Sequence, residues 1–281
     1  MTISIFQASK LVCLLSHFSR LGGRLLKKVV IFGAGGAVGT AFQNFLRQHQ
    51  GYSCIPWDRH KIPLTNFSEI SSKLETLKPD FVFNFAVASS PNGSSEDAPI
   101  INVDFPELLA KKSIALGFRL IHTSTVMVFP ESQNGPYFPD TVPNPTEGYG
   151  LDKRMAEQKI QATKSPHAII ARLGWQIGSK PGSNNMVDFL TKAHQQGPIK
   201  ASRHWFTSCS HLSDTIEALF HLKDREAGIY HIDANRDKSF YEIALQLRSR
   251  LNKPEWVVEP TDEPIYNQIM KDERIKLPLL F

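Results

Sequence analysis

The sequence is poor in the residues that mark several common classes of protein. It has only three cysteines, Cys13, Cys54 and Cys209, which are far apart and form no Cys-x-x-Cys pair. Neither a disulfide framework nor a structural zinc site is therefore indicated, and a reducing cytoplasm is the expected location. The ten histidines are scattered without metal-ligand spacing, so we predict that the chemistry needs no metal.

Acidic residues are absent from the first 57 positions, which carry six basic side chains. The formal net charge of +5 therefore arises at the N-terminus, and the rest of the chain is nearly neutral. No basic stripe interleaved with aromatic residues follows. This distribution argues against a nucleic-acid partner.

Long hydrophobic runs are also lacking. The apolar run Leu11–Leu15 is far too short to cross a bilayer core of about 30 Å, so no membrane span is predicted. We interpret residues 1–26 as an N-terminal extension. A start codon assigned too early and an organelle leader are both compatible with it.

The remaining sequence alternates strand-like and helix-like segments. Short, continuously apolar runs predict strands at Val29–Phe32, Tyr52–Trp57, Phe81–Val87, Arg119–Thr123 and Ala168–Leu173. Helical spacing predicts helices near 38–48, 67–77, 99–116 and 149–163. Because strands without polar alternation are buried on both faces, we predict an α/β fold with a Rossmann-type, doubly wound parallel sheet.

Beyond about residue 176 the alternation of strand-like and helix-like segments becomes less regular. Helices are expected there near 184–196, 212–223 and 239–251. We predict a dinucleotide-binding domain over 27–176. Residues 177–281 are expected to form mainly a smaller substrate-binding cap, interwoven with that domain.

A glycine-rich turn, Gly33-Ala-Gly-Gly36-Ala-Val-Gly39, joins the first predicted strand to the first helix. Gly33 permits a tight turn, Gly36 lets backbone N–H groups approach a pyrophosphate, and Gly39 lets the helix pack closely on the strand. The helix N-terminus adds unpaired donors and partial positive charge. This position between strand and helix predicts that a dinucleotide binds here.

Asp58 follows the second predicted strand, where a carboxylate can bind the adenosine ribose hydroxyls and so favour NAD. Arg59 beside it could pair with a 2′-phosphate and so favour NADP. The choice between NADP(H) and NAD(H) therefore stays open. An ordinary solvated turn is the structural alternative.

Tyr149 and Lys153 lie four residues apart at the start of a predicted helix, which places them on one face. A phenol with a pKa near 10 exchanges protons poorly at neutral pH unless phenolate is stabilised. The ammonium can provide this stabilisation and can hold the nicotinamide ribose. Thr125 ends a buried strand at the same predicted crevice and could hold the carbonyl oxygen, although an ordinary Ser/Thr-rich strand end would look similar.

These residues resemble the extended short-chain dehydrogenase/reductase family, and within it the dTDP-4-dehydrorhamnose reductases, over most of residues 28–278. The segments that match are 29–39, Pro79–Asn84, Asn102-Val-Asp, Ser124-Thr125 with Val128-Phe129, Tyr149-Gly with Lys153, and Arg172–Trp175. The resemblance implies catalysis by Thr125, Tyr149 and Lys153. It also implies cofactor contacts at Gly36, Ala37, Val38, Leu64, Ala86, Val87 and Ala88, and a substrate contact at Trp175.

The resemblance further implies NAD(P)H-dependent reduction of a keto group on a nucleotide-linked deoxysugar, in the synthesis of cell-surface polysaccharide precursors. Two segments depart from the family pattern. Val126-Met127 replaces Asp-Tyr, and Ser89–Ser95 replaces an acidic stretch. Both lie where substrate or subunit contacts are expected, so the identity of the sugar stays open.

Other readings remain. A sugar-nucleotide epimerase of the same superfamily would retain its cofactor, and a regulatory subunit like that of methionine adenosyltransferase would bind cofactor without turnover. The intact Thr125, Tyr149 and Lys153 favour an enzyme. Arg203 could bind the substrate diphosphate or could lie in a surface turn. A homodimer is compatible with the sequence.

Overall fold

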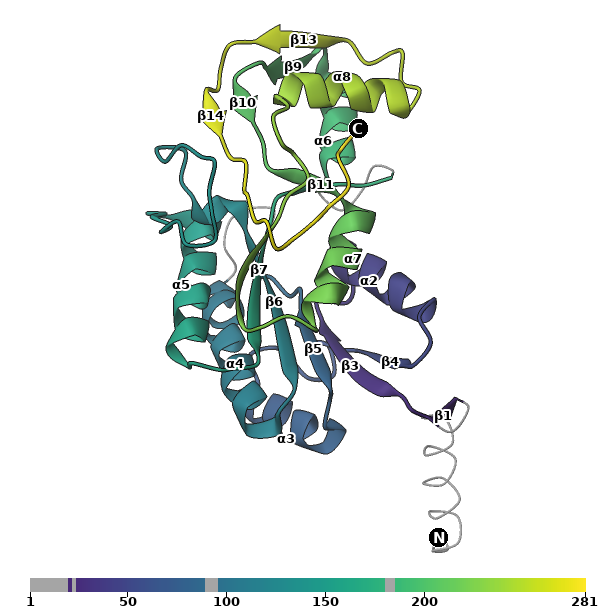
Figure 1. Ribbon diagram of the computed structural model, residues 1–281, viewed down its shortest axis with the longest axis vertical. Helices are drawn as coiled ribbons and strands as arrows, with labels where there is room; N and C mark the ends of the chain where they lie inside the picture. The colour runs from purple at the N-terminus through teal and green to yellow at the C-terminus, as the bar shows by residue number, and fades with distance from the viewer. Residues whose placement is uncertain (1–19, 22–23, 89–95, 180–184) are drawn as a thin grey trace, which may run out of the picture.

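The computed structural model describes residues 20–21, 24–88, 96–179 and 185–281. Its centre is a six-stranded sheet in the order β12-β7-β6-β5-β3-β4, and every neighbouring pair is parallel (Figure 1). The strands are β3 (Lys27–Phe32), β4 (Tyr52–Pro56), β5 (Phe81–Asn84), β6 (Arg119–Thr125), β7 (Ala168–Leu173) and β12 (Gly228–Ile232). The predicted α/β fold is confirmed.

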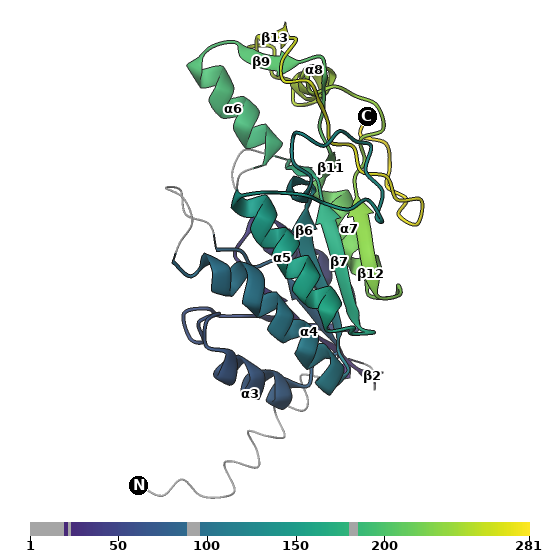
Figure 2. The ribbon, with the colours of Figure 1, turned by 90° about the vertical axis from the view of Figure 1, so that its left-hand side faces the viewer.

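Helices cover both faces of this sheet, which explains its continuously apolar strands. The helices α3 (Phe67–Leu77), α4 (Phe105–Leu116) and α5 (Gly148–Ala162) lie together on one face (Figure 2). The other face carries α2 (Ala37–Arg47) and α7 (Leu212–Leu222). Along β3, Val29 and Ile31 belong to the core on the α2 and α7 side, whereas Val30 and Phe32 belong to the opposite core.

The chain leaves β3 toward β4 on one side and returns to β5 on the other, so the direction of winding changes between β3 and β5. In open α/β sheets, ligands bind beside such a switch point at the carboxyl ends of the strands. The predicted glycine turn follows β3 at this end. The topology therefore places the predicted cofactor loop at the switch point.

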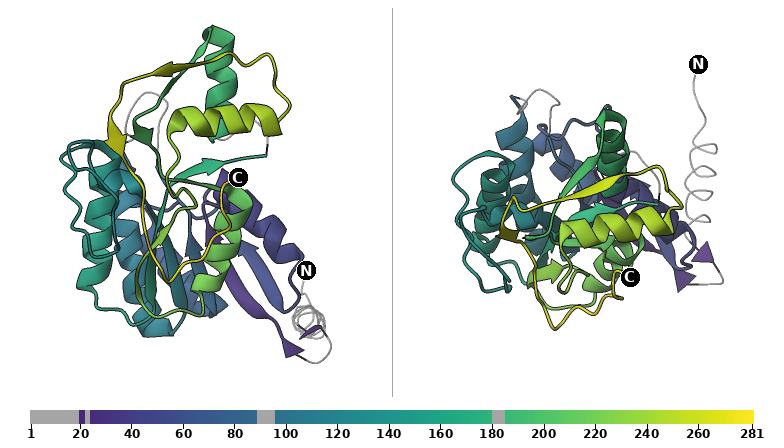
Figure 3. Two further views of the ribbon diagram at one scale, coloured as in Figure 1. Left: turned by 45° about the horizontal axis from the view of Figure 1, so that its top comes forward. Right: turned by 90° about the horizontal axis from the view of Figure 1, so that it is seen from above.

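Above this end of the sheet lies a smaller cap (Figure 3). Its helices are α6 (Met186–Gln196) and α8 (Phe240–Arg250). Its paired strands are β8 (Trp175–Ile177) with β11 (Cys209–His211), β9 (Ile199–Ser202) with β13 (Val258–Thr261), and β10 (Trp205–Phe206) with β14 (Tyr266–Asn267). The cap has its own apolar core, which includes Leu190, Ile243, Leu247 and Trp256.

The cap is not a separate stretch of chain. After β11, the chain returns to the main sheet as α7 and β12, so residues 212–232 lie outside the cap although they follow the predicted division at residue 176. The side chain of Asp233 then links segments of the chain where it passes between the main sheet and the cap. Its buried carboxylate accepts hydrogen bonds from the backbone N–H groups of Cys209, Asn235 and Met270.

Most of the predicted N-terminal extension 1–26 lies outside the described residues. Within its described part, β1 (Arg20–Leu21) and β2 (Arg24–Leu25) form a small antiparallel sheet. In the part of the chain that the structure describes, no helix combines the length and the apolar character that crossing a membrane requires.

Candidate active site

Two glycines of the turn at the switch point, Gly33 and Gly39, have no room for a side chain. Gly33 has φ +73°, and a Cβ added to it would lie 2.5 Å from the carbonyl carbon of Phe85. A Cβ added at Gly39 would overlap the carbonyl oxygen of Gly33. The close packing predicted for Gly39 therefore has a visible cause.

The first turn of α2 faces this crevice without a side-chain cap, since Gly36 occupies the N-cap position. Uncapped N–H groups at a helix N-terminus suit a pyrophosphate, so the residues present fit a dinucleotide. Gly36 itself has φ −77°, and a Cβ there would make only an ordinary contact. Roles for Gly36, Ala37 and Val38 beside phosphates thus stay predictions.

The residues predicted for the adenosine end lie near the end of β4. The exposed Asp58 carboxylate accepts a hydrogen bond from the N–H of His60 and lies 3.7 Å from the Lys61 ammonium. The hydrogen bond is the main cause that lowers the pKa of Asp58. Arg59 is exposed, and Leu64 is buried in the core beside β3. Their contacts with a cofactor stay predictions.

The segment after β5 lies at the same end of the sheet as the glycine turn. Ala86 is buried, whereas Val87 is 39% exposed. Both backbone groups of Ala88 bind the Asn102 side chain: the N–H donates to Oδ1 at 2.9 Å, and the C=O accepts from Nδ2 at 3.1 Å. Asn102 is buried in η1 (Ile100–Asp104), a π-helical turn before α4. An amide side chain therefore fixes the segment for which cofactor contacts are predicted.

Thr125 ends β6 and caps the short 3₁₀ helix η2 (Val126–Val128), because its Oγ1 accepts a hydrogen bond from the N–H of Met127 at 3.2 Å. The hydroxyl proton can therefore be donated to another acceptor. The first turn of α5 packs directly on η2. A Cβ added at Gly150 would overlap the carbonyl oxygen of Met127, so glycine is what lets Tyr149 approach the end of β6.

Tyr149 and Lys153 lie on one face of α5, with the Lys153 Nζ 5.7 Å from the centroid of the Tyr149 ring. Tyr149 is 37% exposed, but protein atoms around its hydroxyl and the Asp152 carboxylate raise its pKa. Lys153 is 2% exposed, and its Nζ donates to the carbonyl oxygen of Thr123 at 2.9 Å. Burial lowers the pKa of Lys153 to about 8, although Glu157 and Asp152 oppose this shift.

A buried ion pair anchors α5 to the sheet. The Glu157 carboxylate accepts from Arg172 Nε at 2.9 Å and Nη2 at 2.7 Å, and from Ser124 Oγ at 2.6 Å. Glu157 and Arg172 are 0% and 1% exposed. Arg172 Nη1 also lies 3.2 Å from His231 Nε2 on β12. Because burial lowers the pKa of His231 to about 3, its imidazole is neutral and accepts this bond.

The predicted substrate residues lie in the cap. Trp175 comes two residues after Leu173, the register partner of Thr125, so it enters the cap directly beside the catalytic strand end. Its ring packs with Phe189, Trp205 and Phe240 at centroid distances of 5.2, 6.2 and 6.0 Å, respectively.

Arg203 is exposed, and its guanidinium lies 5.6 Å from the centroid of the Tyr241 ring on α8. The contact with a substrate diphosphate stays a prediction. The predicted substrate segment Ser89–Ser95 lies outside the described residues.

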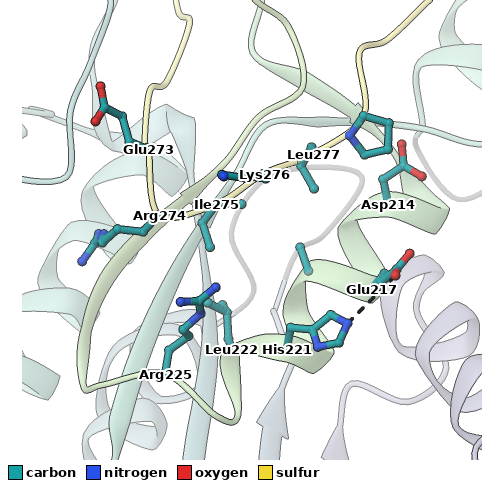
Figure 4. A pocket seen from close by; sticks show the side chains of 12 residues that line it. Asp214, Glu217, His221, Leu222, Arg225, Glu273, Arg274, Ile275, Lys276 and Leu277 are labelled. Carbon is teal, nitrogen blue, oxygen red and sulfur yellow. Dashed lines mark ion pairs between the residues drawn. The ribbon is translucent and has the colours of Figure 1, made fainter.

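A hollow of about 680 Å³ lies on the other side of the molecule, between α7 and the segment Glu273–Pro278 (Figure 4). Its lining includes His221, which pairs with Glu217 at 3.9 Å, together with Arg225 and Lys276. It is located on the α2 and α7 face, whereas Tyr149 and Lys153 come from α5 on the opposite face. The predicted catalytic residues Tyr149 and Lys153 therefore do not line this hollow.

Asn102, Glu157 and Gly150 have structural roles that were not predicted from the sequence. Glu157 continues the spacing of Tyr149 and Lys153 by one further turn, so helical periodicity could have placed it on the same face. Gly150 directly follows the predicted catalytic tyrosine. The contact between Asn102 and Ala88 has no local sequence signal, since the two residues meet only through the tertiary fold.

A sequence model of the family described as RmlD substrate binding domain matches residues 27–272. The chain belongs to this family. Spore coat polysaccharide biosynthesis protein SpsK of Bacillus subtilis is 27% identical over 247 residues, which cover 86% of each chain. The dTDP-4-dehydrorhamnose reductase of Aggregatibacter actinomycetemcomitans is 24% identical over 79% of this chain and 78% of its own length.

Similarity also extends to a protein that is named for a different role. Methionine adenosyltransferase 2 subunit beta of Xenopus tropicalis is 24% identical over 85% of this chain and 77% of its own. Among solved structures, dTDP-4-dehydrorhamnose reductase from Bacillus anthracis, in complex with NADP, superposes with a TM-score of 0.78. That match has 23% identity and covers 91% of this chain and 95% of the other, which establishes the shared fold.

Proposed function

We propose that the chain is an NAD(P)H-dependent reductase that converts a keto group on a nucleotide-linked deoxysugar into a hydroxyl group. The observation that supports this proposal is that Thr125 at the end of β6 and the Tyr149–Lys153 pair on α5 belong to the carboxyl end of the sheet, the end at which the uncapped N-terminus of α2 also lies. Relatives named dTDP-4-dehydrorhamnose reductase and a polysaccharide biosynthesis protein support this substrate class.

A reduced nicotinamide dinucleotide, when bound, supplies hydride for this reaction. Backbone N–H groups at Gly36, Ala37 and Val38 would hold its pyrophosphate, and Ala86–Ala88 would line its path. The Thr125 hydroxyl is placed to donate a hydrogen bond to the substrate carbonyl oxygen. Tyr149 is placed to give that oxygen a proton, while the Lys153 ammonium stabilises the phenolate that remains.

The decisive assay measures NADPH and NADH oxidation against a panel of nucleotide-linked 4-keto sugars, beginning with dTDP-linked 6-deoxy sugars. We expect Tyr149→Phe to lower kcat by about 10²–10⁴-fold, because proton transfer is lost, while NADPH affinity stays near that of the wild type. Unchanged turnover in Tyr149→Phe would exclude this proton donor.

Tyr52→Phe is a matched control, because Tyr52 lies on β4 and packs against Phe81 and Phe220, away from the crevice. It loses the same hydroxyl and should retain full activity. A loss in both variants would indicate a general effect on the fold.

A second candidate is a cofactor-binding regulatory subunit, which the similarity to methionine adenosyltransferase 2 subunit beta favours. The intact Thr125, Tyr149 and Lys153 support the enzyme instead. Tight NADPH binding without turnover on any sugar, together with co-elution with a methionine adenosyltransferase catalytic subunit, would favour the subunit.

We place the reaction in the cytoplasm, where reduced cofactors and nucleotide sugars are available. The epimerase alternative would show no net oxidation of NADPH in the same assay. Association into a homodimer also stays a prediction, and sedimentation of the purified chain would test it.

A further inference from the structure

Asp152 lies between the two catalytic residues of α5, and the proposed mechanism does not use it. Its carboxylate Oδ2 accepts a hydrogen bond from Asn102 Nδ2 at 3.1 Å. The same Asn102 amide holds both backbone groups of Ala88. A continuous chain of hydrogen bonds therefore joins the catalytic helix, through η1, to the segment that follows β5.

The Asp152 carboxylate completes the hydrogen bonding of the Asn102 amide. An asparagine side chain has one carbonyl oxygen and two N–H groups. Here Oδ1 serves the Ala88 N–H, while Nδ2 serves the Ala88 carbonyl and Asp152. Asn102 is 2% exposed, so an unpaired amide proton at this position would be costly. Asp152 thus supplies the partner for the second Nδ2 proton while the amide binds Ala88.

We propose that Asp152 is a positioning residue that couples the segment after β5, for which cofactor contacts are predicted, to the Tyr149–Lys153 pair. It acts by its bond to Asn102 and by its negative charge beside the ammonium. This inference rests on the proposed function, because it takes Tyr149 and Lys153 as the catalytic pair. It adds a residue that contacts neither substrate nor cofactor.

The Asp152 charge acts on Lys153 together with other groups near the ammonium. Lys153 is buried, and the two carboxylates that raise its pKa are Glu157, the larger cause, and Asp152, both on α5. Burial lowers the pKa of His122 far below its usual range, so that imidazole is neutral. Glu157 is bound to Arg172, which offsets its charge. Asp152 is bound only to a neutral amide among the hydrogen bonds described here, so its charge is not offset in the same way.

Two substitutions separate the bond from the charge. Asp152→Asn removes the charge but keeps a carbonyl oxygen that can accept from Asn102. Asp152→Ala removes both. The matched control is Asp104→Asn. Asp104 lies on the neighbouring η1, and its carboxylate pairs with Lys159 at 2.5 Å. Two readouts are independent of turnover: the NADPH dissociation constant, from quenching of protein fluorescence, and the Lys153 pKa, from ¹³Cε lysine NMR assigned with Lys153→Met.

We expect the pKa of Lys153 to fall in both Asp152 variants and to stay constant in Asp104→Asn, because only the former lose the adjacent negative charge. NADPH affinity should fall about three- to tenfold in Asp152→Ala and stay within about twofold in Asp152→Asn, since only the alanine variant loses the hydrogen bond. The basic limb of kcat/KM should move to lower pH in both Asp152 variants.

Equal NADPH affinity in the wild type and Asp152→Ala would overturn the positioning role, and an unchanged Lys153 pKa would overturn the electrostatic role. Neither result depends on the sugar substrate. If no sugar is reduced but both binding and pKa change as expected, the coupling holds and the proposed function fails.

Discussion

At the residue scale, the central feature is a lysine ammonium that is almost completely removed from water. Desolvation favours the neutral amine, whereas the nearby carboxylates favour the charged form. The result is a pKa of about 8 for Lys153, much closer to neutrality than that of an exposed lysine. The side chain is therefore charged at pH 7, but with a small margin.

Because the pKa of Lys153 lies close to neutral pH, kcat/KM should depend on pH. Lys153 loses its proton as pH rises through about 8, and with it the positive charge that stabilises phenolate. We therefore expect kcat/KM of the free enzyme to fall above about pH 8, well before an ordinary lysine would titrate. Initial rates between pH 6 and 10, in buffers of constant ionic strength, would measure this. A profile flat to pH 10 would contradict the assignment.

The residues proposed to carry the chemistry could be selected from the sequence because their spacing is local. The four-residue interval between Tyr149 and Lys153 predicts a shared helix face, and the structure places them so. The glycine turn is also local. By contrast, Asn102 and Glu157 act through residues on other elements, and only the fold shows these contacts.

At the scale of elements, α5 is held at its N-terminus by η2 and along its length by the buried pair of Glu157 and Arg172. The strand and helix pattern predicted this helix correctly. It did not predict that the helix would rest on η2 through a glycine, because that contact depends on the path of the chain after β6.

Gly150→Ala should therefore impair both stability and catalysis. The added methyl group would overlap the Met127 carbonyl and push the start of α5 away from Thr125. We expect a loss of about 1–3 kcal/mol in the free energy of unfolding, with a disproportionate fall in kcat. Urea denaturation and steady-state kinetics would measure this. Gln158→Ala, on the exposed side of α5, is the control and should change little.

The pair of Glu157 and Arg172 offers a second test. Arg172→Met leaves a buried carboxylate without its partner, which should cost about 3–5 kcal/mol of unfolding free energy. The double variant Arg172→Met with Glu157→Gln removes both charges and should recover part of this loss. Denaturation of the single and double variants measures the coupling. Additive losses would show that the two side chains act independently.

At the scale of the whole molecule, alternation of strands and helices was enough to predict the parallel sheet and the position of the crevice. The spacing of apolar residues could not show that residues 212–232 rejoin the sheet. A buried helix or strand has the same apolar pattern whether it belongs to the cap or to the main sheet. That return is visible only in the pairing of β12 with β7. The family assigned from the motifs is confirmed by the match over residues 27–272.

The return of the chain from the cap to the sheet limits how this protein can move. The chain passes between the sheet and the cap from β7 to β8, from β11 to α7, and again after β12. At this last crossing the Asp233 carboxylate accepts hydrogen bonds from three backbone amides. The cap could not rotate about a single hinge, since several connections to the sheet would have to bend together. We therefore expect a crevice that is largely preformed, into which both reactants diffuse, and whose gating is confined to side chains and short loops at its rim.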